Sequence, residues 1–165
     1  MPERPLLLGR GGIGVDDVHS VAERRRTVRI DPAALDAMQR TSDALLRAVD
    51  AGTPVYGVTT GLGARSVHQL CADELAGMSL RTVRGRATGV GDPLPERVVR
   101  AGLLCRAASM AVGGSGASAV IADLLVAMLN AGVHPVVPSI GALGTGDLAP
   151  MAHVGLPSSA RVVPA

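Results

Sequence analysis

Residues 31–52, DPAALDAMQRTSDALLRAVDAG, carry the start, the repeat and the end of an amphipathic helix. Asp31 belongs to the residue types that cap a helix N-terminus, and Pro32 stands at the first helical position, where the N–H that proline lacks would have no helical partner. Apolar residues then recur near helical spacing as far as Gly52, which can end the helix. The sequence therefore predicts a helix over residues 33–50.

The same reasoning predicts three further helices, over residues 72–86, about 95–112 and 118–130. The helix at 95–112 carries apolar residues on nearly all sides, Val98 and Cys105 among them, so we expect it at the centre of a helical bundle. The predicted fold class is mainly α, with few short strands and two glycine-rich loops.

A chain of 165 residues suits a single domain, 1–165. Residues 1–30 are mixed and glycine-rich, so we expect an N-terminal arm with short β-like pieces at Leu6–Leu8 and Val28–Ile30. Residues 31–157 are expected to form the helical part and residues 158–165 a tail.

Composition and charge narrow the class of protein. All 16 basic residues are arginine and the net charge is only +2, so we expect no nucleic-acid partner, and Arg24–Arg26 is interpreted as a solvated face or an interface. No segment approaches the about 20 apolar residues of a membrane span, which predicts no membrane association. Cys71 and Cys105 have neither metal-ligand spacing nor a secretory context, so reduced thiols in a cytoplasmic protein are expected.

The string GRGGIG, residues 9–14, matches the G-x-G-x-x-G pattern of dinucleotide-binding turns. That pattern requires a strand before it and a helix after it. The residues after Gly14 predict no strong helix, and no alternation of strands and helices is visible. We therefore expect no external cofactor at this turn.

Two glycine-rich loops are the candidate chemical parts. In VYGVTTGLG, residues 55–63, Tyr56 could act as a base if neighbouring charges or dipoles favour its phenolate, or it could simply be a packed tyrosine with a satisfied hydroxyl. In GALGTGDLAP, residues 141–150, glycines around Thr145 allow a sharp fold and Asp147 could cap a helix, although an ordinary capped turn has the same pattern. The four histidines show no metal-ligand spacing, so no metal site is expected.

Taken together, these loops resemble the aromatic amino-acid lyase family, which includes histidine, tyrosine and phenylalanine ammonia-lyases and related aminomutases. Residues 56–63 are similar to the family's Tyr-Gly-Val-Asn-Thr-Gly-Phe-Gly loop, and residues 143–153 to its Gly-Ala-Ser-Gly-Asp-Leu-Ala-Pro-Leu-(Ala/Ser)-His motif. Asn130–Pro138 matches the family's Asn-Ala-Gly-Val-His-Pro-Val-Val-Pro almost letter for letter. The resemblance implies the N-terminal part of the helical ammonia-lyase fold.

In that family an Ala-Ser-Gly tripeptide cyclises and loses water to form methylidene-imidazolone, MIO, an electrophile that the substrate amine attacks. Carried over by position, the resemblance places Gly144, Thr145 and Gly146 at the electrophile, Asp147 beside it in support, and Tyr56 as the base. It also assigns substrate binding to five residues: Thr60, Gly61, Leu62, Gly85 and Arg86.

Three departures from the family pattern shape the expected function. Thr145 places an extra methyl group on the electrophilic carbon, which favours an unmodified loop over an MIO group. Arg86, with Gly85, replaces the family's side-chain recognition pair, and its forked donors suit an acidic substrate. The family's enzymes are also much longer, so we expect either a naturally split enzyme, in which a second chain carries the C-terminal part of the fold, or a fragment or remnant of such an enzyme.

Three functional hypotheses follow. The first is the small subunit of a split ammonia-lyase-like enzyme that performs an elimination or an amino shift on an amino-acid-like substrate. The second is an MIO-independent lyase, isomerase or cyclase that uses Tyr56 and Arg86. The third is a non-catalytic scaffold partner.

Overall fold

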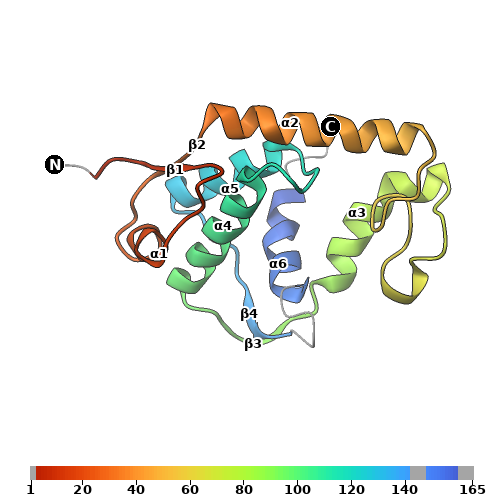
Figure 1. The fold of residues 1–165 in the computed structure, drawn as a ribbon. Helices are drawn as coiled ribbons and strands as arrows, with labels where there is room; N and C mark the ends of the chain where they lie inside the picture. The colour runs from red at the N-terminus through yellow and green to blue at the C-terminus, as the bar shows by residue number, and fades with distance from the viewer. Residues whose placement is uncertain (1–2, 142–147, 160–165) are drawn as a thin grey trace.

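The structure, a computed structural model, describes residues 3–141 and 148–159. Figure 1 shows a mainly helical molecule with short strands, as the helix signals of the sequence predict. The elements follow in this order: β1 (Leu6–Leu8), α1 (Val15–Ala22), β2 (Val28–Ile30), α2 (Pro32–Asp50), the 3-10 turn η1 (Gly63–Arg65), α3 (Ala72–Arg86), β3 (Val90–Pro93), α4 (Glu96–Ala111), α5 (Ala119–Ala131), β4 (Pro138–Ile140) and α6 (Leu148–Ser159). Each of the four expected helices is present, with its ends within two residues of the predicted positions.

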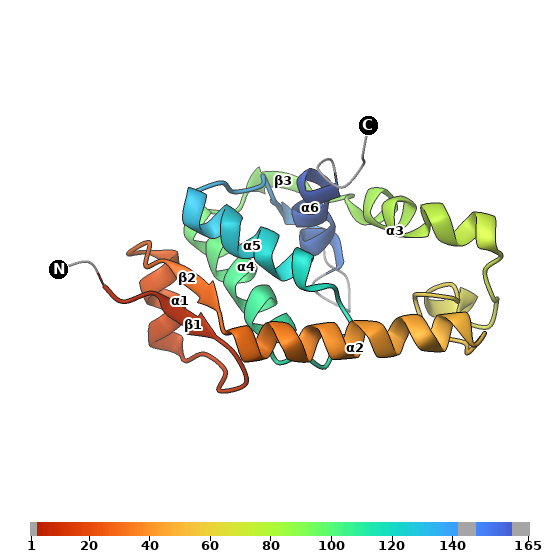
Figure 2. The ribbon, with the colours of Figure 1, turned by 90° about the horizontal axis from the view of Figure 1, so that it is seen from above.

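Helix α2 forms where the opening stretch predicts it. The Asp31 carboxylate accepts the N–H of Ala33 at 3.0 Å, which satisfies one of the free donors at the helix start. Ala34, Ala37 and Met38 are buried on the side of the core. Figure 2 shows α2 running from the β1–β2 pair at one end to the loop that precedes α3 at the other.

Helix α4 is the centre of the molecule. Leu103, Leu104, Ala107 and Ala111 are fully buried, and the helix packs against α5, α1, α2 and β1. The expected central position is therefore confirmed. Not every apolar side chain of α4 is buried: Val98 is 43% exposed and Cys105 is also exposed.

The first 30 residues contain a helix that the sequence analysis missed. Helix α1 begins directly after Gly14, where the Asp17 carboxylate accepts the Gly14 N–H at 3.1 Å and so caps the helix start. Strands β1 and β2 are parallel on either side of it, so a small strand–helix–strand unit exists, contrary to expectation. The expectation failed because α1 has only eight residues, two of them aspartates. Asp16 and Asp17 in its first turn disfavour a phosphate there.

Helix α3 lies at the edge of the fold. It packs mainly against α6, while its N-terminal end follows the loop of residues 53–71 (Figure 1). None of the α3 side chains whose exposure the structure describes is fully buried. Beyond α3, β3 pairs antiparallel with β4, with Val90 opposite Ile140 and Pro93 opposite Pro138. This pairing joins the end of α3 to the segment that leads into the second glycine-rich loop.

Candidate active site

The loop of residues 53–71 folds back on itself through its backbone. Thr60 faces Gln69 in an isolated antiparallel bridge, and the Gly61 N–H donates to the His68 carbonyl at 3.1 Å. Gly61 is required there, because a Cβ at this position would lie 2.5 Å from the carbonyl oxygen of Arg65. The close approach fixes the backbone of Arg65 against Gly61.

Hydroxyl groups hold the tyrosine end of this loop. The Thr60 side chain is buried, and its hydroxyl donates to the Gly61 carbonyl at 3.1 Å and lies 3.4 Å from the Gly57 N–H, which donates to it. The Tyr56 hydroxyl oxygen accepts the N–H of Gly63 at 3.1 Å, while the residue is 64% exposed. Tyr56 is therefore oriented by its own loop and accessible from outside.

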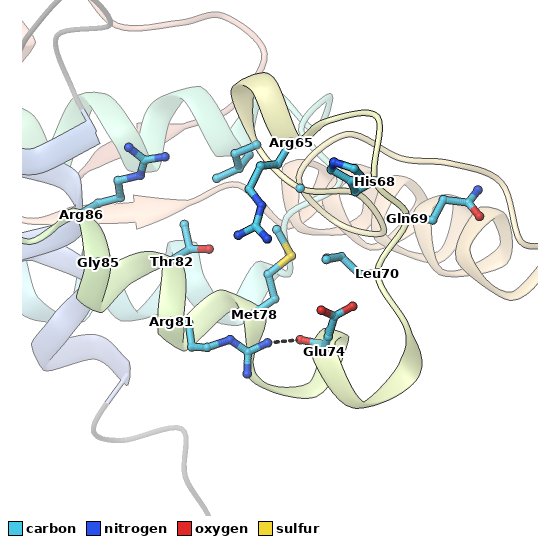
Figure 3. Close-up of a pocket in the computed structure, with 12 residues that line it drawn as sticks. Arg65, His68, Gln69, Leu70, Glu74, Met78, Arg81, Thr82, Gly85 and Arg86 are labelled. Atoms are coloured by element: carbon cyan, nitrogen blue, oxygen red, sulfur yellow. Dashed lines mark hydrogen bonds between the residues drawn. The ribbon is translucent and has the colours of Figure 1, made fainter.

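A pocket of about 590 Å³ lies between this loop and α3 (Figure 3). Four of the residues expected to bind substrate line it: Gly61, Leu62, Gly85 and Arg86. Tyr56 and Thr60 are not among the described residues that line it. The sequence analysis missed the remaining lining residues: Arg65, His68, Gln69, Leu70, Glu74, Met78, Arg81 and Thr82.

The missed residues of α3 have a signal in the sequence. Glu74, Met78, Arg81 and Thr82 precede Gly85 at intervals of three and four, which places them on one face of a helix. Helical spacing counted back from the recognition pair would have found them. The loop residues Arg65 and His68 carry no comparable signal, because the backbone bridge brings them to the pocket.

The pocket carries an excess of positive charge. Arg65, Arg81 and Arg86 line it, with Glu74 as the one carboxylate among its described lining residues. Glu74 accepts the Cys71 N–H at 3.0 Å at the start of α3. This hydrogen bond to Cys71, aided by the charges of Arg81 and Arg65, lowers the pKa of Glu74 below its usual value. The carboxylate is thus held ionised as a helix cap.

The two ends of the second glycine-rich loop are fixed beside the end of α3. On α6, His153 Nε2 accepts the Gly89 N–H at 3.0 Å. Gly141, which follows β4, lies so close to Gly89 that a Cβ on Gly141 would be 2.9 Å from the Gly89 Cα. The candidate electrophile residues Gly144, Thr145 and Gly146, with Asp147, lie outside the described residues.

The segment Asn130–Pro138 has a structural role. The Asn130 side chain accepts the Val28 N–H and donates to the Val28 carbonyl, both at 2.9 Å, which ties α5 to β2. His134 Nε2 lies 3.2 Å from a Glu96 carboxylate oxygen and 3.3 Å from Arg100 Nη1. These contacts give His134 a structural role beside α4.

The described part of the chain offers neither a metal site nor a membrane-spanning helix. No group of three or more His, Cys, Asp or Glu residues there could hold a metal ion. No helix in residues 3–141 and 148–159 is long and apolar enough to cross a membrane.

Comparison with known proteins agrees with the fold. The family model for aromatic amino acid lyases matches residues 13–160, and the chain belongs to this family. Histidine ammonia-lyase of Koribacter versatilis is 43% identical over 154 residues, which are 93% of this chain and 30% of that protein. Histidine ammonia-lyase of Deinococcus radiodurans is 39% identical over 152 residues, 92% of this chain and 29% of that protein.

Solved structures show the same relationship. An ergothionase from Treponema denticola, an ergothioneine-degrading enzyme, superposes with a TM-score of 0.88 at 30% identity, over 93% of this chain and 31% of that one. Tyrosine aminomutase from Streptomyces globisporus has a TM-score of 0.86 at 31% identity, over 92% of this chain and 28% of that one. The chain therefore spans about 30% of the length of the relatives it matches.

Proposed function

We propose that this chain supplies three parts of an ammonia-lyase-like active site. They are the tyrosine loop (residues 55–63), the recognition pair Gly85 and Arg86, and the electrophile loop (residues 141–150). In this proposal a second chain, which carries the C-terminal part of the lyase fold, completes the site. One observation carries the proposal: both flanks of the electrophile loop contact Gly89, three residues after Arg86. A substrate group held by Arg86 would therefore lie near both flanks of this loop.

The proposed reaction is an elimination or an amino shift on an amino-acid-like substrate. The names of the relatives, histidine ammonia-lyases and a tyrosine aminomutase, support these two outcomes. Tyr56 is the proposed base, since its hydroxyl is oriented and accessible. Arg86 would hold an acidic group of the substrate, because a guanidinium forms forked hydrogen bonds to a carboxylate.

The self-derived electrophile does not fit the tripeptide of this chain well. Thr145 has a hydroxyl that could leave, but its methyl group would remain on the carbon that the amine must attack. Gly144 also replaces the alanine of the family's tripeptide. We therefore favour an unmodified loop and derive no step through the MIO group. This makes acid–base elimination, isomerisation or cyclisation with Tyr56 and Arg86 the second candidate function.

Exposed apolar side chains support the need for a second chain. Val120 on α5 is 67% exposed, Val136 is 69% exposed and Ile140 on β4 is 64% exposed. Burying such side chains against another surface is favourable, at about 25 cal/mol per Å² of apolar area. We expect co-expression with the second chain to yield a stable hetero-oligomer in which turnover requires both chains.

Intact mass of the purified chain tests which route operates. An MIO route removes two waters, about 36 Da by stoichiometry, and Thr145→Ala should abolish both the mass loss and the activity. An acid–base route leaves the encoded mass, tolerates Thr145→Ala and requires the Tyr56 hydroxyl. An unmodified chain whose Tyr56→Phe variant retains full turnover would refute both routes and leave a scaffold function.

A further inference from the structure

Two arginines of the pocket between the loop and α3, Arg65 and Arg86, form no side-chain ion pair with a described residue, although the charge of Arg65 acts on the Glu74 carboxylate. Arg81 is engaged differently, because its Nη2 donates to the backbone carbonyl of Glu74. One oxygen of the Glu74 carboxylate is already used by the Cys71 N–H. Two cationic donors therefore remain available in a concave site.

The two arginines come from opposite walls. Arg65 ends η1 on the loop, and its carbonyl accepts the His68 N–H at 3.1 Å, which fixes its backbone at the rim. Arg86 is the last residue of α3. Figure 3 shows the Arg65 side chain pointing from the loop toward α3, with Thr82 between it and Arg86 along the helix. An anion in this space would meet donors from both sides.

We propose that the pocket binds the anionic group of a small substrate, a carboxylate or a phosphate, between Arg65 and Arg86. A cavity of about 590 Å³ is of the size that holds small molecules, and Leu62, Leu70 and Met78 supply apolar surface for the rest of the ligand. Charge-assisted hydrogen bonds from two guanidinium groups give the anion a specific place. The assignment of this group to a substrate rests on the proposed function, whereas the anion site does not.

Inorganic phosphate is the first probe, because its binding requires no reaction. Calorimetric titration of the full chain at low ionic strength should show binding, and Arg65→Gln and Arg86→Gln should each weaken it about 10- to 100-fold. Arg84→Gln is the matched control, since Arg84 is exposed on the same helix and is not among the lining residues. The proposal is overturned if phosphate does not bind, or if the control weakens binding as much as Arg86→Gln does.

Amino acids with matched neutral partners test the substrate class. L-glutamate should bind more tightly than L-glutamine, or O-phospho-L-serine more tightly than L-serine, and the pair with the larger ratio identifies a carboxylate or a phosphate. Arg86→Lys should keep part of the preference, which separates loss of charge from loss of fold. Equal binding of charged and neutral partners overturns the assignment. Phosphate binding retained by a two-chain complex without turnover would refute the proposed function but not the anion site.

Discussion

Replacing Arg100 by methionine should destabilise the fold far more than the same replacement of a surface arginine. Arg100 is 1% exposed and lies on α4 between the C-terminal ends of two helices. Its Nε and Nη2 donate to the Val21 carbonyl of α1 at 3.2 and 2.8 Å, and its Nη1 donates to the Leu129 carbonyl of α5 at 3.1 Å. The last carbonyls of a helix have no intrahelical partner, so one guanidinium satisfies two helix ends.

The expected loss of stability depends on which hydrogen-bond donors remain for each carbonyl. In Arg100→Met the Val21 carbonyl loses both of its recorded donors, at a cost of about 1–3 kcal/mol for a buried unpaired acceptor. The Leu129 carbonyl still accepts the Gly132 N–H at 3.3 Å, so its loss is closer to about 1 kcal/mol. Burial lowers the pKa of Arg100, with Arg25 adding to this effect and Glu96 opposing it. The buried charge is therefore itself unfavourable, and removing it offsets part of the stability lost with the hydrogen bonds. We expect a net loss of about 2–4 kcal/mol.

Urea denaturation of the full chain, followed by circular dichroism, measures this loss. Arg97→Met is the control on the same helix, because Arg97 forms an exposed ion pair with Glu23 at 3.6 Å. Such a pair contributes at most about 1 kcal/mol. The reasoning is wrong if Arg100→Met lowers the free energy of unfolding no more than Arg97→Met does.

Two further predictions concern the parts of the candidate site. Gly61→Ala should displace the loop, because the new Cβ would lie 2.5 Å from the Arg65 carbonyl oxygen. Phosphate binding should then weaken at least tenfold. Gly114→Ala is the control: its new Cβ meets no atom within 4 Å, so phosphate binding should be unchanged. His153→Ala removes the acceptor of the Gly89 N–H, so hydrogen exchange at Gly89 should become several-fold faster. An unchanged exchange rate at Gly89 would show that this hydrogen bond does not hold the flank of the electrophile loop.

The sequence predicts the regular parts of this fold because their determinants are local. The cap at Asp31 and the helical repeat of α2 are contained within one turn or a few turns, and the structure follows them. Arg100 shows the limit: the apolar surroundings of α4 are visible in the sequence, but the burial of an arginine depends on two carbonyls contributed by α1 and α5.

The candidate site divides in the same way. Gly85 and Arg86 follow from a positional match with the family motif, and both line the pocket. Arg65 could not be found, because its place depends on a bridge between Thr60 and Gln69, nine residues apart. Residues 142–147 lie outside the described residues, so the roles of Gly144, Thr145 and Gly146 stay predictions.

Burial is distributed unequally between the core and the candidate site, and this has a measurable consequence. The fully buried side chains lie on α4, α5, α2 and the β1–α1–β2 unit, whereas the described side chains of α3 are at most half-buried or are exposed. Segments with few buried apolar contacts open at lower free-energy cost than core helices do. Backbone amides of α3 should therefore exchange with solvent at least tenfold faster than those of residues 99–111 in the chain alone.

Addition of the second chain should slow exchange in α3 and in residues 53–71 while leaving α4 unchanged, because the core is already complete without it. Equal exchange in α3 and α4 before mixing would mean that the site end is as stable as the core, and slowing confined to α4 would place the partner on the wrong face for this proposal.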